Sequence, residues 1–306
     1  MLPLRLLSLL PSATEIIHCL ELGKYQVGRS HECDFPACVR DLPVCTRPAF
    51  EVNGSSAEIN RQVKKRTTAA LSLYEVDSDL IRQLRPTHIV TQTQCDVCAV
   101  SLADVERAVR AEFGIHSRIL TLAPGVLADV WMDIRRVAAG LDHAEPAGTV
   151  VSTLEARIAA IRKTAAQAGT RPRVAALEWL EPLMAAGNWI PELIEIAGGE
   201  SVFGNAGQHS SWMTWHDLFS ADPDVIISLP CGFDLKRTRS EMRCLEQTPE
   251  WKKLQAVRAS RVFVCDGNQF MNRPGPRLVE SAGIFAQILH PELFCPTLEH
   301  IGWQRL

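Results

Sequence analysis

The chain has 306 residues, which is enough for two domains that each bury a core of their own. Its 32 basic and 35 acidic residues nearly balance, and neither sign forms a long run, so nucleic acid and anionic membrane surfaces are disfavoured as partners. No stretch is long and apolar enough to cross a bilayer. The ten cysteines, with no recognisable export signal, predict reduced thiols and a cytoplasmic location.

Short apolar runs alternate with helical patterns along the chain, which is typical of parallel α/β layering. The runs predicted to be strands are Leu4 to Leu10, Gln26 to Gly28, His88 to Thr91, Arg118 to Leu122, Arg173 to Leu177, Asp224 to Leu229 and Arg261 to Cys265. This number of strands suits two small sheets. The predicted fold class is therefore α/β, with two parallel-sheet lobes.

The sequence after the first strand predicts a helix. Ser12 is expected to cap its N-terminus, and Glu15, three residues later, completes a capping box. Gly23 is expected to end this helix. A further helix is expected to open at residues 101–104 and to run toward Glu112.

A stretch of about 25 residues from Glu145 to Gly169 carries apolar side chains at helical spacing. A helix of that length spans roughly 37 Å and can bridge two lobes, although one more surface helix on a single domain fits the periodicity nearly as well. A Gly-Thr-Arg-Pro breaker precedes the next strand. We expect an N-terminal lobe over 1–143, a linking helix over 144–169 and a C-terminal lobe over 170–306.

Ligands of parallel α/β sheets bind outside the carboxyl ends of the strands, so the loops that follow the strands are candidate sites. Four such loops are rich in cysteine or polar residues. They span residues 30–34, 92–98, 230–234 and 266–276, and four of the ten cysteines fall in them.

Cys95 and Cys98 form a Cys-x-x-Cys pair with three interpretations. As thiolates they hold zinc or another soft metal, with Cys33 or His31 and Cys231 completing the shell. A redox pair is disfavoured, because that chemistry needs the first cysteine at a helix N-terminus. The pair also fits small buried residues in a tight loop. The remaining cysteines are interpreted as packing residues: Cys19, Cys38, Cys45, Cys244, Cys265 and Cys295.

His31 lies between Ser30 and Glu32 and can ligate a metal, although a hydrogen-bonded loop histidine fits a single residue slightly better. Tryptophan is frequent, with seven Trp against two Tyr. Trp179 and Trp189, near strand ends, are expected to cover a large planar ligand, whereas Trp215 is expected to pack in the core.

Several segments resemble, in the same order, the cobalamin-binding substrate-binding proteins of bacterial ABC importers, the class in which a helical backbone joins two lobes. The segments are Arg5 to Ile17, Val27 to Pro36, Thr46 to Pro48, Leu177 to Pro182, Ala186 to Glu192, Asp222 to Ile227, Pro230 to Leu235 and Gly267 to Pro276. The likeness covers nearly the whole chain. It implies a long backbone helix and a ligand cleft between the lobes.

The resemblance also implies the ligand, which is a corrinoid such as cobalamin or a related metal chelate. The positions carried over as ligand contacts are Pro11, Ser12, His31, Glu32, Arg47, Gln94, Trp179, Trp189, Phe233, Phe270 and Arg273. Ser12 and the helix amides would meet an anionic or carbonyl group, and Arg47 and Arg273 would clamp a phosphate or carboxylate. Candidate ligands for a metal are Cys33, Cys95, Cys98 and Cys231.

Three classes of function remain open. The first is a binding protein without catalysis of its own, which is favoured because the common catalytic motifs are missing from the sequence. The second is a cytoplasmic metalloprotein that binds zinc or an iron–sulfur centre through His31 and the loop cysteines, as a structural or an enzyme site. The third is an adaptor that docks an ABC permease from the inside or passes a cofactor to an accepting protein, with exposed acidic residues forming the docking surface.

Overall fold

The computed structural model describes residues 3–69, 72–93 and 117–306. The chain divides into two compact units. Unit 1 comprises Met1–Gly54, Arg61–Pro124 and Ala128–Ser152, and unit 2 comprises Ser55–Asn60, Gly125–Leu127 and Thr153–Leu306. The last passage from one unit to the other falls inside a long helix, between Ser152 and Thr153.

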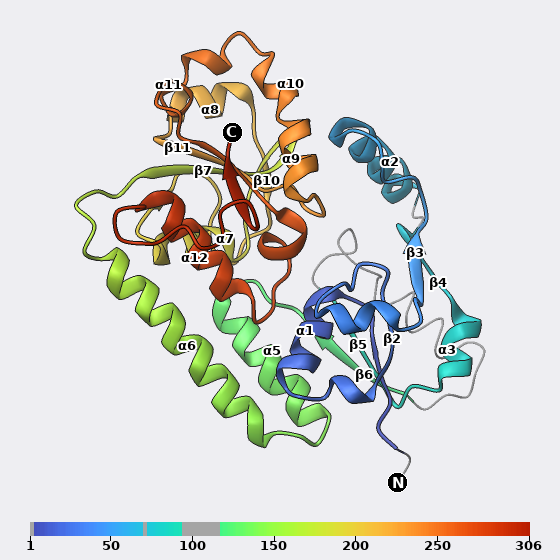
Figure 1. The fold of residues 1–306 in the computed structure, drawn as a ribbon. Helices are drawn as coiled ribbons and strands as arrows, with labels where there is room; N and C mark the ends of the chain where they lie inside the picture. The colour runs from blue at the N-terminus through green and yellow to red at the C-terminus, as the bar shows by residue number, and fades with distance from the viewer. Residues whose placement is uncertain (1–2, 70–71, 94–116) are drawn as a thin grey trace. The chain divides into compact units, whose positions relative to one another are not determined.

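Unit 1 is built on a four-stranded parallel sheet in the order β2-β1-β5-β6 (Figure 1). Its strands are β1 (Leu6–Ser8), β2 (Gln26–Arg29), β5 (His88–Gln92) and β6 (Arg118–Leu122). A separate antiparallel pair consists of β3 (Thr46–Pro48) and β4 (Tyr74–Val76). Leu7 and Ile89 are adjacent across β1 and β5, and both are fully buried, so the sheet supplies the centre of this core.

The described helices that lie wholly in unit 1 are α1 (Pro11–Cys19), η1 (Gly23–Tyr25), η2 (Ala37–Asp41) and α3 (Ser78–Leu84). Three further helices have residues in both units: α2 (Ser56–Thr68), α5 (Leu127–Gly140) and α6 (Glu145–Ala165). The helix predicted to open at residues 101–104 lies outside the described residues.

The predicted capping of α1 is wrong. The helix begins at Pro11, two residues earlier than expected, and Leu10 holds the cap position without a side-chain hydrogen bond. Proline suits this first position because its fixed φ is helical and its missing N–H would have no partner there. Gly23 does not end the helix either. A Cβ on it would lie 2.3 Å from Cε1 of His18, so the glycine leaves space for that ring.

Helix α6 has 21 residues and ends at Ala165 rather than at Gly169. At 1.5 Å per residue it is about 32 Å long. Its buried side chains recur every three or four residues, which is the expected helical spacing, and they include Ala147, Val151 and Leu154. Among the helices that the structure describes, none has both the length and the apolar character that a membrane span requires.

Unit 2 contains a seven-stranded mixed sheet in the order β10-β8-β7-β11-β12-β13, with β9 also pairing with β7. Its strands are β7 (Arg173–Leu180), β8 (Leu183–Ala185), β9 (Glu200–Ser201), β10 (Ser211–Trp212), β11 (Val225–Ser228), β12 (Val262–Cys265) and β13 (Trp303–Arg305). The central strands β7, β11 and β12 are parallel, and β8, β10 and β13 run antiparallel to their neighbours. The prediction of parallel sheets therefore holds for unit 1 and for the centre of unit 2.

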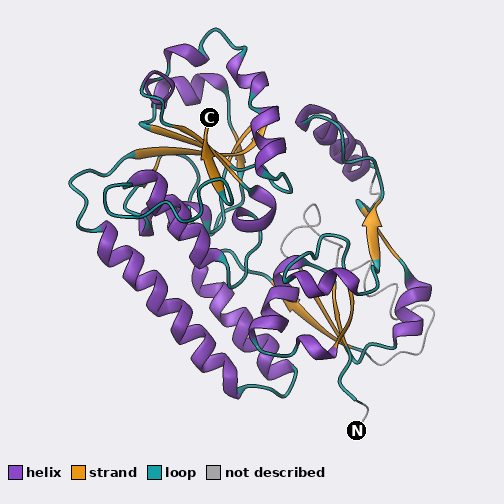
Figure 2. Cartoon of the chain, in the orientation of Figure 1, coloured by secondary structure: helices purple, strands orange, loops and turns teal. Residues whose placement is uncertain are grey.

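Helices cover both faces of the unit 2 sheet (Figure 2). They are α7 (Ile190–Ile196), α8 (Trp215–Ala221), α9 (Leu235–Glu241), α10 (Arg243–Glu246), η3 (Trp251–Lys253), α11 (Gln255–Arg258), η4 (Gly267–Met271) and α12 (Leu278–Leu289). Figure 1 shows α8 and α11 on one side of the sheet and α7 and α12 on the other.

The core on the α8 side of this sheet is rich in indole rings. Trp215 stacks on Phe219 with ring centroids 5.8 Å apart and meets Trp251 edge-on at 6.5 Å. All three pack with the buried residues of β7, β11 and β12. The core role predicted for Trp215 is therefore confirmed.

Candidate functional site

The first strand-end loop of unit 1 leads from β1 directly into α1. Ser12 lies in the first turn of that helix, whose N–H groups have no side-chain cap. It is 1 % exposed, and its Oγ has no hydrogen-bond partner in the described part of the chain. A buried hydroxyl without a partner costs free energy, so the position suits a polar ligand atom or a water molecule.

The second loop of unit 1 holds His31 in a network of hydroxyl groups. The backbone N of His31 donates to Oγ1 of Thr46 at 3.1 Å, and its Nδ1 lies 2.8 Å from the same oxygen. That Oγ1 donates to Oγ of Ser30 at 3.1 Å. The ring of Tyr74 lies against the imidazole, with centroids 5.6 Å apart. Burial, with a smaller effect of the Arg29 guanidinium, lowers the pKa of His31 to about 4, so the imidazole is neutral at pH 7.

Arg47 and Glu75 lie opposite each other on β3 and β4 and form an ion pair. The Nε of Arg47 donates to Oε2 of Glu75 at 2.7 Å. Their side chains are 78 % and 50 % exposed, so the pair adds little stability. An anionic ligand group that used Arg47 as a clamp would have to displace the Glu75 carboxylate.

The predicted metal ligands are only partly described. Gln94, Cys95 and Cys98 lie outside the described residues. Beside His31, Glu32 is half-buried and Cys33 is fully buried in unit 1, and Cys231 is half-buried in unit 2. Among the described residues no group of three or more His, Cys, Asp or Glu side chains is arranged to hold a metal ion. The described part of the structure gives no support to a zinc or iron–sulfur centre.

The eight described cysteines are free thiols. Cys45 and Cys265 are buried as predicted, and burial raises the pKa of the Cys45 thiol to about 11 and that of Cys265 well above its usual value. Cys38 and Cys295 are exposed. Their predicted role in packing is therefore wrong, because Cys38 is exposed within η2 and Cys295 is exposed in the segment after α12.

In unit 2, three side chains from the carboxyl edge of the sheet are stacked on one another. Trp179, near the end of β7, contacts Phe233 with ring centroids 5.3 Å apart. The guanidinium of Arg237, from α9, lies 3.9 Å from the centroid of the Phe233 ring. Burial lowers the pKa of this guanidinium, and the carboxylates of Glu241 and Asp234 oppose that shift. The arrangement is a cation–π stack at a strand end.

The loops after β11 and β12 are bonded to each other, which fixes the position of Phe233. The backbone N of Asn268 donates to the O of Phe233 at 3.1 Å. The side chain of Asn272 donates to the O of Leu229 at 3.0 Å. The Nη2 of Arg273 donates to Oδ1 of Asn268 at 2.9 Å. The two loops therefore behave as one rigid support for the aromatic stack.

Three predicted ligand contacts of unit 2 are buried. Trp189, Phe270 and Arg273 are 6 %, 6 % and 4 % exposed. The Nε1 of Trp189 donates to the O of Met271 at 2.8 Å, so the indole joins the loop after β12 to α7. The guanidinium of Arg277 lies 5.4 Å from the centroid of the Phe270 ring. Ligand contact by these three side chains stays a prediction, and only a small part of each side chain is exposed.

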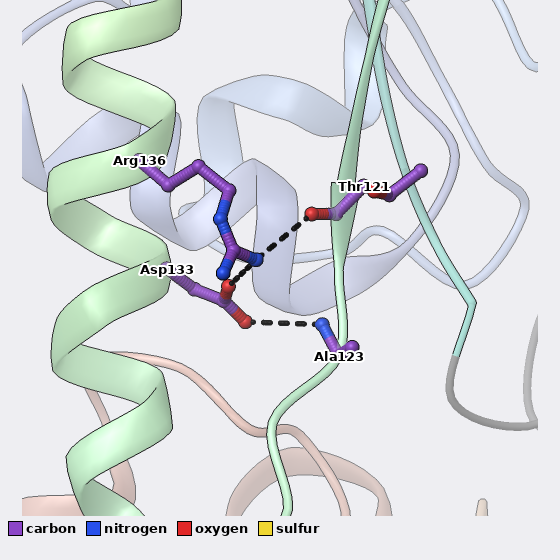
Figure 3. A network of polar contacts seen from close by, with 4 residues as sticks. All are labelled: Thr121, Ala123, Asp133 and Arg136. Carbon is purple, nitrogen blue, oxygen red and sulfur yellow. Dashed lines mark hydrogen bonds and ion pairs between the residues drawn. The ribbon is translucent and has the colours of Figure 1, made fainter.

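Asp133, in α5 of unit 1, is a buried carboxyl that the sequence did not single out (Figure 3). Its Oδ2 accepts a hydrogen bond from the N of Ala123 at 3.3 Å, and its Oδ1 pairs with Nη1 of Arg136 at 2.6 Å. That Nη1 also donates to the O of Thr121. Burial raises the pKa of Asp133 to about 6, which Arg136 only partly opposes. This network holds α5 against the end of β6, so we interpret its role as structural.

Sequence reasoning missed the residues that support the candidate ligand contacts. Thr46 lies within a segment chosen for its arginine and proline, Tyr74 starts an unpredicted strand, and Arg237 follows the Asp234 cap of α9. One sequence signal could have located α9, namely Asp234 directly before a helical run. In the structure its side chain caps the helix by accepting a hydrogen bond from the N of Arg237.

Comparison with known proteins places this geometry in context. The sequence profile of the family described as periplasmic binding protein matches residues 46–269. The periplasmic vitamin B12 binding protein BtuF of Vibrio cholerae is similar in structure, with a TM-score of 0.67 and 16 % identity over 94 % of this chain and 96 % of that one. The periplasmic heme-binding protein RhuT of Roseiflexus sp. RS-1 has a TM-score of 0.67 and 22 % identity over 93 % and 98 % of the two chains.

A third similar structure is an ABC-type Fe3+-hydroxamate transport system from Saccharomonospora viridis DSM 43017. It has a TM-score of 0.66 and 19 % identity over 94 % of this chain and 93 % of that one. No curated protein matches the chain. At these levels of identity the structural likeness establishes the shared fold.

Proposed function

Because this chain belongs to the periplasmic binding protein family, we propose that it binds a metal chelate of low molecular mass, and that this chelate is a corrinoid such as cobalamin. The observation that carries the proposal is the stack of Trp179, Phe233 and Arg237 at the carboxyl edge of the unit 2 sheet. Flat rings at a strand end suit the faces and rim of a large planar macrocycle.

The proteins of similar fold support this chemical class. They are named for vitamin B12, heme and Fe3+-hydroxamate, all of which hold a metal inside an organic chelate. The corrinoid is preferred because the sequence segments of this chain resemble the cobalamin-binding group. We propose that the protein performs no bond chemistry on the ligand.

We also propose that the protein delivers its ligand to an ABC permease. The support is the family itself and the transport system named for one protein of similar fold. Copurification of the chain with a permease from detergent extracts tests this step separately from ligand binding.

The aromatic stack allows a matched test of the proposal. Purified protein is titrated with aquacobalamin, hemin and ferric ferrichrome, and binding is followed by calorimetry. We expect aquacobalamin to bind with a dissociation constant in the micromolar range or below. Trp179→Leu and Arg237→Gln are expected to weaken binding about tenfold, which corresponds to about 1.4 kcal/mol.

The control is Trp212→Leu. Trp212 lies on β10 in the same unit, is 55 % exposed and is outside the stack, so its replacement is expected to leave the affinity unchanged. If none of the three chelates binds the wild-type protein, the proposed class of ligand is wrong. If binding survives both stack variants unchanged, the chelate is recognised elsewhere.

A further inference from the structure

The indole of Trp179 is bonded to the first turn of α2. Its Nε1 donates to the O of Ser56 at 3.1 Å. Ser56 lies within Ser55–Asn60, the part of α2 and its cap that belongs to unit 2, so this bond is inside the unit that carries the aromatic stack. The strand-end loops fix Phe233, but they make no such bond to the indole. The orientation of Trp179 therefore depends on what fixes Ser56.

Glu241, the last residue of α9, fixes Ser56 through a backbone bond. Its Oε2 accepts from the N of Ser56 at 2.9 Å. The first N–H groups of a helix have no partner inside the helix, and a bond from such a group to a carboxylate is stronger than one between neutral groups. The helix dipole also favours a negative charge at this end. Glu241 therefore supplies the partner that the N–H group of Ser56 does not find inside α2.

The first turn of α2 can pass this restraint on to the indole. A capping box closes the turn, because the N of Ser55 donates to Oε2 of Glu58 at 2.8 Å and the N of Glu58 donates to Oγ of Ser55 at 3.4 Å. Ser56 is 1 % exposed, whereas the other residues of α2 are half-buried or exposed. Glu241 and Trp179 are therefore joined through the buried backbone of Ser56.

The same carboxylate acts on the cation of the stack. Arg237 and Glu241 are four residues apart in α9, a spacing that places two side chains on one face of a helix. Burial lowers the pKa of Arg237, and the carboxylate of Glu241 opposes this shift more than that of Asp234 does. The charge of Glu241 therefore favours the cationic guanidinium that lies on the Phe233 ring.

We propose that Glu241 is a positioning residue of the candidate ligand site, which fixes the indole of Trp179 through the backbone of Ser56. It also holds the charge of Arg237 beside the stack. The inference rests on the proposed function, because the stack is the proposed contact surface for the chelate. Glu241 contributes to affinity by ordering the stack in advance, since side chains that are already ordered lose less conformational entropy when a ligand binds.

The position of the indole can be measured without any ligand. In a proton–nitrogen correlation spectrum of isotope-labelled protein, the Nε1–H resonance of Trp179 is the indole signal that is missing from Trp179→Leu. We expect Glu241→Ala to move this resonance and to speed its exchange with solvent at least about fivefold, because Ser56 is no longer held. Glu241→Gln keeps an acceptor oxygen for the N of Ser56 and is expected to restore most of the protection.

The control is Glu246→Ala. Glu246 is an exposed carboxylate on α10, which follows α9 directly. Its removal changes the net charge by the same amount as Glu241→Ala does. This variant is expected to leave the Trp179 resonance, its exchange rate and the affinity for the chelate as they are in the wild type.

Calorimetry with aquacobalamin, or with hemin where only hemin binds, measures the contribution to affinity. Glu241→Ala is expected to weaken binding about tenfold and Glu241→Gln about threefold, because the amide keeps the acceptor and lacks the charge. Adding Glu241→Ala to Trp179→Leu is expected to weaken binding only about threefold further, which is the part that acts through Arg237.

The outcomes are distinguishable. An unchanged Trp179 resonance in Glu241→Ala overturns the positioning role and leaves the proposed function standing. A full tenfold further loss in the double variant also overturns it, because the two residues then act independently. If neither chelate binds the wild-type protein, the proposed function falls, and the contribution of Glu241 to affinity falls with it.

A second variant covers a failure of Glu241→Ala to fold, as judged by circular dichroism. Ser56→Pro removes the N–H donor of the same bond, at the first helical position, which proline favours, and it keeps the O that accepts from Trp179. The same movement of the Trp179 resonance is expected. A resonance that stays in place in this variant overturns the positioning role.

Discussion

A Cβ on Gly267 would lie 1.9 Å from the carbonyl oxygen of Pro230, a distance at which no side chain fits. Gly267 opens η4 after β12, and Pro230 follows β11, so the two strand-end loops touch through their backbones. The close approach explains why the support for Phe233 is rigid.

Gly267→Ala is therefore expected to destabilise the protein by about 2 to 4 kcal/mol, because backbone atoms must move to relieve the overlap. The measurement is urea denaturation. Gly283→Ala is the control, since Gly283 lies in α12 and its added Cβ meets nothing within 4 Å. The control is expected to be neutral or to stabilise by up to about 1 kcal/mol. Equal stability of the two variants would contradict the close approach.

Asp133 predicts a dependence of stability on pH. Its pKa is raised to about 6 in the folded protein from a usual value near 3.8, so the folded state binds the proton more tightly. Its contribution is fully present below about pH 4 and is lost as the pH rises to about 6, by up to about 3 kcal/mol.

Denaturation of the wild type and of Asp133→Asn at pH 4, 5, 6 and 7 measures this effect. The variant has no titrating carboxyl at this position, so its stability does not follow the titration of Asp133. The difference between variant and wild type is expected to move in favour of the variant between pH 4 and 6. Parallel pH profiles would show that the pKa of Asp133 is not raised.

The thiols are expected to react in an order set by exposure. Cys38 and Cys295 are exposed, whereas Cys45 and Cys265 are buried and have raised pKa values. Iodoacetamide at pH 8 is expected to label the exposed pair at least tenfold faster, because the thiolate is the reactive form. Peptide mapping by mass spectrometry measures the order, and unfolding in urea should abolish it. Early labelling of Cys265 would contradict the described core.

The exposed pair of Arg47 and Glu75 is expected to matter for binding more than for stability. Arg47→Ala and Glu75→Ala should each change the free energy of unfolding by less than about 1 kcal/mol. If Arg47 clamps an anionic group of the ligand, Glu75→Ala strengthens binding of hemin, which carries carboxylates, and Arg47→Ala weakens it. The same direction of change in both variants would remove Arg47 from the ligand contacts.

The main strands could be read from the sequence, and the reason is physical. Segments such as Ile226 to Ser228 and Ile89 to Thr91 are buried on both faces of a parallel sheet, so they appear as continuous apolar runs. The missed strands are two or three residues long. β10 is an exposed edge strand and β4 is only partly buried, and nothing in their composition separates them from loops.

The site was only partly predictable. The approach of His31 to Thr46, or of Arg237 to Phe233, depends on how separate segments pack. The spacing of apolar residues along the sequence carries no information about that packing. The predicted Ser12 cap failed because Pro11 takes the first helical position. The roles of the strand-end residues, the three proposed domain ranges and the cytoplasmic location stay predictions.

Direct binding tests the central claim most simply. Equilibrium dialysis of the purified wild-type protein against aquacobalamin, with bound cobalt quantified by elemental analysis, is the decisive measurement. The account predicts saturation at one chelate per chain with a dissociation constant in the micromolar range or below. Retention no greater than that of an equal mass of an unrelated protein, for aquacobalamin and for hemin alike, would contradict it.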